Sequence, residues 1–176
     1  MSETELKIRI VGDPVLRKKA KRITRVNSEH SGILSQMARL MYESKGVGLA
    51  APQVGLSCRM IVVDIGLGLY KLVNPRIVSR SGRQSFEEGC LSVPGIYINV
   101  KRAKRIRVEA LNENGDPLKI EAQDLLACVL QHEIDHLDGK LIVDYASLLK
   151  KIALKKKLTN LANEKLVQSE DKRSKL

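Results

Sequence analysis

Two histidines that stand four residues apart carry the strongest chemical signal in this sequence. Residues 131–136 read Gln-His-Glu-Ile-Asp-His. In a helix, His132 and His136 would lie on one face about one turn apart, so both imidazoles could bind a single metal ion. Glu133 would point beside that ion, where a carboxylate can accept a proton from bound water. The spacing therefore indicates a catalytic metal site with Glu133 as a candidate general base.

The residues before this motif predict that its helix is buried. Residues 125–130 are apolar on every side, which is typical of a helix in a protein core. The His-Glu-x-x-His pattern fixes only three positions, and a surface helix with two solvated histidines would show the same letters. Half-buried histidines and a glutamate without a partner would be costly, so a metal site is the more economical interpretation.

A third metal ligand is not evident downstream of the motif. Zinc proteases with this helix take the third ligand from a later glutamate, or from a histidine six residues after the second one. Here Ile142 stands at that histidine position, and the first later glutamate is Glu164. Cys90, in the Gly- and Pro-containing segment 87–95, can supply a thiolate instead. A buried inert thiol and a nucleophile are the other roles open to Cys90.

Segment 46–55 is the next unusual feature. It consists of Gly, Ala, Pro and aliphatic residues apart from the amide of Gln53. Small residues let a backbone approach a ligand closely, and Pro52 stiffens the loop that presents Gln53. A tight turn between a helix and a strand would explain the glycines but not the amide. A phosphate-binding loop would need Lys-Ser/Thr after the glycines, which this segment lacks.

The order of the predicted elements favours an α+β fold. The spacing of apolar residues predicts a helix over 28–44, with Ser28 as its N-cap, and Gly46 would end it. Strands are expected at residues 60–65, 70–74, 106–110 and 118–122, the last two joined by a turn at 114–115. We expect mainly antiparallel strands around a buried central helix that carries the His-Glu-x-x-His motif, with an N-terminal and a C-terminal helix.

Length and charge predict one domain with a basic extension. The 176 residues fit a single catalytic domain over 1–150 and a basic C-terminal helix or tail over 151–176, whose end we expect to be disordered. The formal charge is +11, and residues 146–176 alone hold nine basic against three acidic side chains. Such a tail can hold a protein near RNA or the ribosome, or it can be a solvated helical face.

The cysteines and the apolar runs predict where the protein works. Three cysteines form no even disulfide framework, and the first residues carry no apolar signal segment, so we expect a reducing cytoplasm. Cys58 and Cys128 have no setting like that of Cys90 and are expected to be structural. No apolar run approaches the roughly 20 residues of a membrane helix, so a membrane is not an expected partner. DNA is not an expected partner either.

Three segments together resemble the motifs of peptide deformylases, in that family's order and at compatible separations. They are segments 46–53, 88–92 and 131–136. The resemblance covers about residues 6 to 150 and leaves the basic tail outside. It implies a cytoplasmic or organellar metallohydrolase that removes the formyl group from the N-terminal methionine of new proteins and releases formate. It also implies one divalent metal ion, usually Fe2+, with Zn2+, Ni2+ or Co2+ able to occupy the site.

The resemblance further implies roles for individual residues. The metal ligands would be Cys90, His132 and His136. The catalytic residues would be Glu133, as base and then acid, with Gln53 and the backbone N–H of Leu91 as oxyanion donors. Gly48 would contact the substrate through its backbone, and Phe86 would close the pocket for the methionine side chain.

The helix itself predicts the rest of that pocket. Leu125, Cys128 and Val129 stand seven, four and three residues before His132, so they share its face and can form an apolar wall, although each could equally be plain core. An unbranched methionine side chain would fit there. The peptide would pair with the segments of Val47 and Tyr97 as an added strand. Some deformylases carry Arg at the Tyr97 position, and this sequence departs from that subset there. The difference affects contacts with the peptide strand.

Two other functions remain open from the sequence. One is a metallopeptidase that acts on unformylated peptides instead of N-formylmethionyl nascent peptides. The other is a ribosome- or RNA-associated binding protein with a structural metal, in which the lysines at 150–151 and 155–157 make the contact. Such a structural site would need a fourth protein ligand, and none is evident in the motifs.

Overall fold

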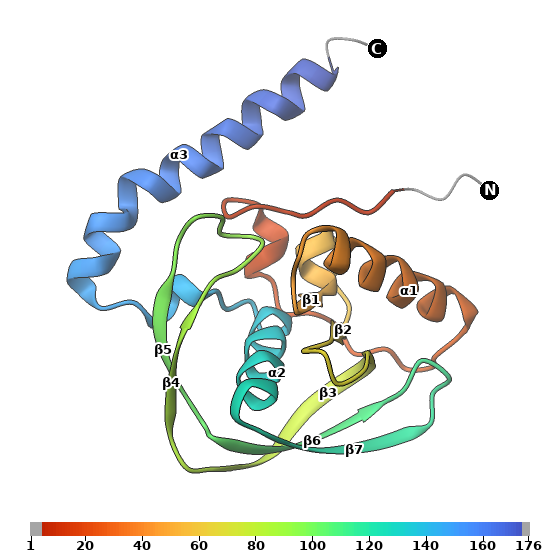
Figure 1. Cartoon of the computed structure of the whole chain (residues 1–176). Coiled ribbons are helices and arrows are strands. Elements are labelled where there is room, and N and C mark those ends of the chain that lie inside the picture. Colours follow the sequence, from red (N-terminus) through yellow and green to blue (C-terminus); the bar gives the residue numbers. More distant parts are fainter. Residues whose placement is uncertain (1–4, 174–176) are drawn as a thin grey trace.

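The strands of this protein curve around one helix (Figure 1). The computed structural model describes residues 5–173, with the side chains of residues 5–163. In chain order the elements are η1 (Pro14–Arg17), α1 (Ser28–Glu43), β1 (Gly48–Ala50), η2 (Ala51–Val54), β2 (Met60–Val63), β3 (Tyr70–Ser81), β4 (Gln84–Glu88), β5 (Ile98–Arg102), β6 (Arg105–Leu111), β7 (Pro117–Gln123), α2 (Asp124–Leu137), η3 (Ile142–Tyr145) and α3 (Leu148–Arg173). The predicted α+β class is confirmed.

Two antiparallel sheets form the β layer. The larger has the strand order β1-β2-β3-β6-β7, and β4 and β5 form a separate pair. All of these named pairings are antiparallel, as expected. The predicted hairpin is β6 and β7, whose turn contains Gly115 at φ +90°, a conformation that glycine adopts without strain. Alternate residues of β6 are buried, so the hairpin has one wet face.

Helix α2 fills the space between the two sheets. Eleven of its fourteen residues are buried. Leu130 is fully buried in a cluster that also contains Ile61 from β2, Leu72 from β3 and Val108 from β6. The predicted buried central helix is therefore confirmed, and the apolar run before the motif is what anchors it.

The ends of the elements differ from the predictions in local ways. Helix α1 begins at Ser28, but its N-cap is Asn27, so the prediction of Ser28 as the cap is wrong by one residue. The Asn27 side chain accepts a hydrogen bond from the backbone N–H of His30 at 3.1 Å, and His30 Nδ1 accepts one from the Asn27 N–H at 3.2 Å. This reciprocal pair satisfies two helix-terminal N–H groups, which Ser28 could not do from its position. Strand β3 also extends to Ser81, well beyond the predicted residue 74.

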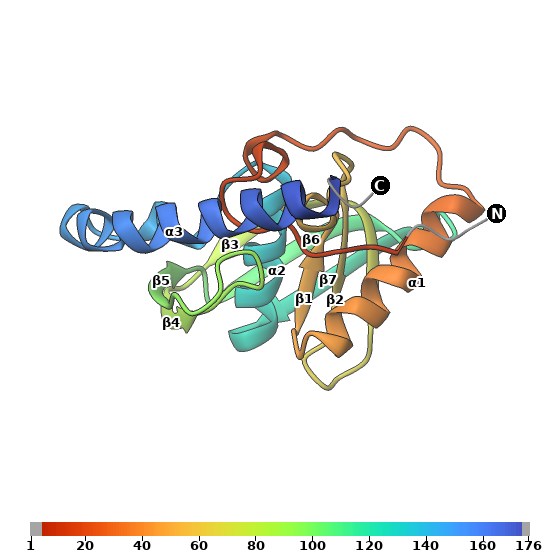
Figure 2. The same cartoon turned by 90° about the horizontal axis from the view of Figure 1, so that it is seen from above.

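Helix α3 leaves the domain after η3 and runs along its surface (Figure 2). It carries the basic residues expected of the C-terminal segment. No helix among residues 5–173 is both long and apolar enough to span a bilayer. The expected division into 1–150 and 151–176 stays a prediction. The expectation of a disordered end also stays one, because residues 174–176 lie outside those that the structure describes.

Candidate metal centre

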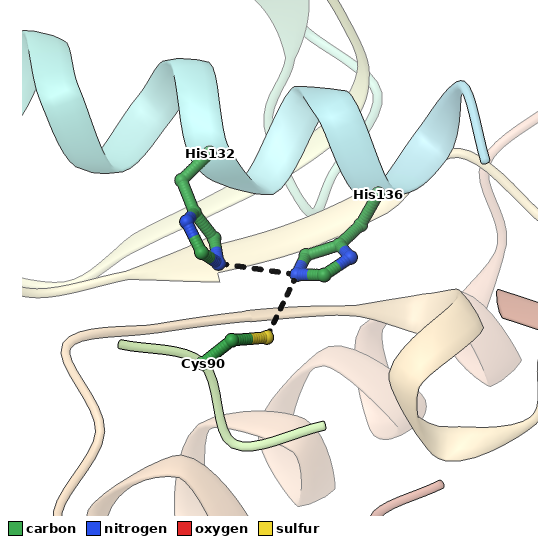
Figure 3. A group of neighbouring side chains, drawn as sticks. All are labelled: Cys90, His132 and His136. Atoms are coloured by element: carbon green, nitrogen blue, oxygen red, sulfur yellow. Dashed lines mark hydrogen bonds between the residues drawn. The ribbon is translucent and has the colours of Figure 1, made fainter. Parts of the chain in front are cut away.

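Three predicted ligands converge from two elements (Figure 3). His132 and His136 project from one face of α2, and Cys90 reaches them from the segment that follows β4. The two Nε2 atoms lie 3.1 Å apart, and Cys90 Sγ lies 3.3 Å from Nε2 of His136. All three ligand atoms lie within 4.8 Å of one another. The predicted convergence of Cys90 with the two histidines is therefore present in the structure.

The chemistry of these donors fits a divalent transition metal. One thiolate and two imidazole nitrogens are a set that Fe2+, Zn2+, Ni2+ and Co2+ can all accept. Burial, together with the nearby His132, holds the pKa of His136 well below its ordinary value, so this ring stays neutral and keeps a lone pair for a metal. Like His136, His132 is buried. A cation between these atoms would account for three donors that point at one place.

Glu88 sets the orientation of one ligand. Its Oε2 lies 2.9 Å from Nδ1 of His132, so Nδ1 donates its proton to the carboxylate and Nε2 is left as the metal-binding nitrogen. Glu88 Oε1 accepts a hydrogen bond from Cys128 Sγ at 3.1 Å. Glu88 belongs to one of the sequence motifs, but no role was predicted for it. Its position two residues before Cys90 was the only signal available.

Arg102 neutralises the buried charge of Glu88. Its Nε and Nη2 donate to the two Glu88 oxygens at 2.8 and 2.9 Å. Burial alone would raise the pKa of Glu88, but the hydrogen bonds and charges of Arg102 and His132 outweigh it and lower the pKa to about 2. Glu88 is therefore an anion at every physiological pH. Nothing in the sequence pattern of β5 pointed to this arginine.

The network continues to the surface through two further residues. Arg102 Nη1 donates to Asp135 at 2.5 Å, and the hydroxyl of Tyr145 donates to the same Asp135 oxygen at 2.6 Å. The guanidinium also lies 4.8 Å from the centre of the Tyr145 ring. Asp135 belongs to the motif helix, so α2, β4, β5 and η3 are held together by one set of charged hydrogen bonds.

Glu133 lies beside the ligands in an environment that favours proton exchange. Its side chain is buried, and Oε2 has no hydrogen-bond partner within the described part of the chain. Burial raises the pKa of Glu133 to about 7, although the charge of His132 lowers it. A carboxylate with that pKa can both accept and return a proton at neutral pH.

Gly48 is required for this position of Glu133. A Cβ atom built on Gly48 would overlap Oε1 of Glu133 and lie 2.8 Å from its Cδ. The requirement here is for close approach of backbone and side chain. A small residue at position 48 is therefore needed to leave room for the Glu133 carboxylate.

Gln53 is held with its amide nitrogen toward the ligands. It lies in η2 and is almost completely buried. Its Oε1 accepts a hydrogen bond from the Ala50 N–H at 2.8 Å, which fixes the orientation of the amide. Nε2 then donates to Ser92 Oγ at 3.2 Å and to Cys90 Sγ at 3.5 Å. A preorganised neutral donor therefore stands next to the cysteine ligand.

A cavity of about 500 Å³ opens beside His132 and Glu133. All of the residues predicted to bind substrate line it: Val47, Gly48, Phe86, Tyr97, Leu125, Cys128 and Val129. Gln53, Cys90 and Leu91 line it too. Cys128 and Val129 are buried, whereas Val47, Tyr97 and Leu125 are 48%, 57% and 44% exposed and lie at the rim. The structure brings every predicted site residue except His136 to this cavity, and His136 lies behind His132.

A buried Cys-His-His centre, with a carboxylate and an amide beside an apolar cavity, defines the site of a metal-dependent hydrolase. The family model of polypeptide deformylases matches residues 5–152. This chain belongs to the peptide deformylase family. The match ends near the start of α3, so most of that helix lies outside it.

Curated relatives agree with this assignment. A peptide deformylase of Caldanaerobacter subterraneus is 53% identical over 137 residues, which cover 78% of this chain and 86% of that protein. One from Pelotomaculum thermopropionicum is 47% identical over 149 residues, which cover 85% of this chain and 96% of that protein. The similarity therefore spans nearly the full length of the relatives.

Solved structures agree as well. The crystal structure of a peptide deformylase from Legionella pneumophila matches with a TM-score of 0.84 at 44% identity, and covers 94% of this chain and 98% of that one. The enzyme from Thermus thermophilus matches with a TM-score of 0.85 at 42% identity over 89% and 97% of the two chains. A third, from Synechococcus elongatus in complex with actinonin, gives 0.82 at 41% identity over 89% and 87%.

Proposed function

We propose that this chain removes the formyl group from the N-terminal methionine of newly synthesised proteins, with Cys90, His132 and His136 as the metal ligands. The enzyme is a hydrolase, and its products are formate and a free α-amine. One observation carries the assignment of the site: a cysteine and two imidazoles converge, and Glu133 lies beside them at a cavity of about 500 Å³.

The centre would hold one divalent ion, with Fe2+ the preferred candidate and Zn2+, Ni2+ or Co2+ as alternatives. When bound, such an ion supplies Lewis acidity and lowers the pKa of a water from 15.7 toward roughly 7. The protein's part is to hold the ligands correctly turned. Glu88 orients His132 by accepting a hydrogen bond from Nδ1, and Gln53 donates a hydrogen bond to Sγ of Cys90.

Glu133 acts as general base and then as general acid. Its unpaired Oε2 accepts the proton that water loses, and the same oxygen later delivers that proton to the departing amine. A pKa near 7 suits both directions, because neither protonation state is then strongly favoured at neutral pH. The carboxylate is shielded from solvent, so the proton is kept at the reacting atoms.

Gln53 and Leu91 stabilise the negative charge that develops on the formyl oxygen. The amide Nε2 of Gln53 is already oriented by its bond to Ala50, and the backbone N–H of Leu91 follows Cys90 directly in the chain. Loss of one such donor typically costs about 3 to 4 kcal/mol.

The cavity selects the N-terminal residue by its apolar floor. Cys128 and Val129 form that floor with Leu125 and Phe86 at its edge, and an unbranched methionine side chain can fill it. The following residues of the peptide would lie between the segments of Val47 and Tyr97 and pair with their backbones, which admits many sequences.

The test is an assay for formate with a formyl-Met peptide, run anaerobically with Fe2+ and repeated with Ni2+. The same peptide without the formyl group distinguishes deformylation from peptidase activity. We expect formate from the first and no cleavage of the second. No turnover with either metal, or cleavage of the unformylated peptide, would contradict the proposal.

The ligand assignment has a separate test in Cys90→Ser. The change replaces a soft thiolate by a hydroxyl, so metal retention should fall, as measured by elemental analysis after dialysis. Cys58→Ser is the matched control, because Cys58 lies outside the ligand cluster. Equal metal content in the two variants would show that Cys90 is not the third ligand.

The basic helix supports a location at the ribosome in the cytoplasm. The lysines at 150–151 and 155–157 present positive charge on an exposed helix, which suits ribosomal RNA. Co-sedimentation with ribosomes should weaken as salt is raised and should be lost when residues 150–176 are deleted. Sedimentation that is unchanged by the deletion would dispose of this role for α3.

A further inference from the structure

Helix α3 lies against the wall of the substrate cavity. Leu154, Leu158 and Leu161 pack against a core cluster that contains Val93 and Ile96. These apolar residues of α3 recur at helical spacing and so mark one face. Figures 1 and 2 both show α3 running beside the loop between β4 and β5. The loop that carries Cys90 at one end therefore has α3 as its outer support at the other.

Two lysines of α3 hold the backbone of this loop. Lys157 Nζ donates to the carbonyl of Gly95 at 2.6 Å, and Lys150 Nζ donates to the carbonyl of Tyr97 at 3.0 Å. The lysines are seven residues apart, two turns of the helix, so they reach the same side. Gly95 has φ +68°, a conformation that other residues adopt with strain, and its carbonyl is one of the two that are bound.

The same loop segment lines the cavity. Pro94, Gly95, Ile96 and Tyr97 all belong to its wall. Tyr97 is at the rim, where the second and later residues of a peptide would lie, whereas the methionine floor is formed by Cys128 and Val129 of α2. The α3 lysines thus contact the cavity wall at residues 95 and 97 and none of the metal ligands.

Helix α3 also contacts the N-terminal arm, the extended segment that contains Val11 and Gly12. This arm in turn binds the Ser92 end of the loop. A Cβ on Gly12 would lie only 2.6 Å from Cβ of Ala162, so the arm and the helix approach closely here. The neighbouring Val11 donates its N–H to the Ser92 carbonyl at 2.8 Å. The segment from Ser92 to Tyr97 is therefore held by α3 directly and through the arm.

We propose that Lys150 and Lys157 are positioning residues for the peptide chain beyond its first residue. They hold residues 94–97 at a fixed distance from the Val47 segment. A bound peptide strand needs that distance to pair with both segments. This inference rests on the proposed deformylase function and adds a role for the helix that the family match mostly leaves out. It predicts that their loss weakens binding of longer substrates without changing the chemical step, because neither lysine touches the reacting groups.

The test compares two double variants with the same charge change. Lys150→Met with Lys157→Met removes both donors and keeps most of each side chain. Lys155→Met with Lys156→Met is the control, since within the described chain neither of these lysines donates to residues 94–97. Substrates are a C-terminally amidated formyl-Met tetrapeptide and formylmethionine amide. Elemental analysis confirms equal metal loading.

We expect the first variant to raise KM for the tetrapeptide by about three- to tenfold, as for two lost hydrogen bonds to charged groups at the surface. Its kcat, and its KM for formylmethionine amide, should equal those of wild type. Replacement of both lysines by Arg should restore most of the tetrapeptide binding, because a donor returns. The control variant should match wild type with both substrates.

Hydrogen exchange of the backbone provides a second readout that needs no activity. Amides 95–98 should exchange faster in the Lys150→Met, Lys157→Met variant than in the control. Wild type that releases no formate would contradict the proposed function, and the exchange rates would still test the support by α3. Equal tetrapeptide KM values in active double variants, or equal exchange at 95–98, would overturn the inference.

Discussion

Helices α2 and α3 show two ways in which one chain uses a helix. α2 has eleven of fourteen residues buried, and its Asp135 is paired with the buried Arg102. α3 is longer, and its described side chains are mostly exposed, with Leu154, Leu158 and Leu161 partly buried. Contacts around α2 are shielded from water, and those of α3 are screened by it. Substitutions in or around α2 should therefore have much larger effects than equivalent ones in α3.

The largest expected effect is on catalysis at α2. Glu133→Gln keeps the shape of the side chain but removes the base, so kcat should fall by about a hundred- to ten-thousand-fold. Metal content should stay at the wild-type level, because Glu133 is not a predicted ligand. Lys155→Gln in α3 is the comparison and should leave kcat unchanged. Wild-type turnover in Glu133→Gln would remove Glu133 from the mechanism.

The next effect concerns the buried ion pair beside α2. Arg102→Met leaves the buried Glu88 charged and without its arginine partner, so the free energy of unfolding should fall by about 3 to 5 kcal/mol, measured by denaturant titration. Arg76→Met is the control, because the Arg76 pair with Glu109 is at the surface, with the arginine 64% exposed. That change should cost about 1 kcal/mol or less. Equal losses would mean that the buried pair is no more important than the exposed one.

The same pair predicts an acid-sensitive part of the stability. The pKa of Glu88 is about 2 in the folded protein, below its ordinary value of 4.5. A depressed pKa gives stabilisation that is complete above pH 4.5 and is lost as the pH falls toward 2. The loss should be on the order of 3 kcal/mol. Unfolding of metal-free wild type and Glu88→Gln across this range measures it, and parallel pH curves would contradict the assignment.

The smallest effect is expected when a leucine side chain of α3 is truncated to alanine. Leu130→Ala in α2 opens a cavity at a fully buried site and should cost about 2 to 5 kcal/mol. Leu158→Ala in α3 removes the same atoms from a partly buried site, so solvent can fill the space, and the loss should be about 1 kcal/mol or less. Thermal unfolding of the two variants gives the comparison directly. Similar losses would mean that α3 is as much a part of the core as α2.

Much of this site could be predicted from the sequence. Its residues are either close together in the chain or the only candidates of their chemical type. The turn of a helix places His132 and His136 together whatever the rest of the chain does. Cys90 was the economical third ligand because the downstream positions that proteases use hold Ile142 and a distant Glu164. The small residues of segment 46–53 predicted a close approach of the backbone to a ligand, and the structure shows Gly48 in close approach to the Glu133 side chain.

The supporting residues could not be predicted in the same way. Glu88 is 44 residues from His132 in the chain, and Arg102 is 33 from Asp135, so no periodicity connects them. The strands β4 and β5, which carry Glu88 and Arg102, were not predicted as strands. Their register, which sets Glu88 opposite Ile98, depends on packing against α2 and η3 and not on a turn signal.

The sequence by itself determined which chemistry this protein can perform, because the donor types and the four-residue histidine spacing follow from side-chain chemistry and helix geometry alone. Only the tertiary structure decided how that chemistry is held in place. It turned His132 by way of Glu88, enclosed Glu133 so that its pKa rises, and bound two lysines of α3 to the carbonyls of Gly95 and Tyr97 in the cavity wall. These contacts join residues distant in the chain, and packing of the whole fold is the only force that brings them together.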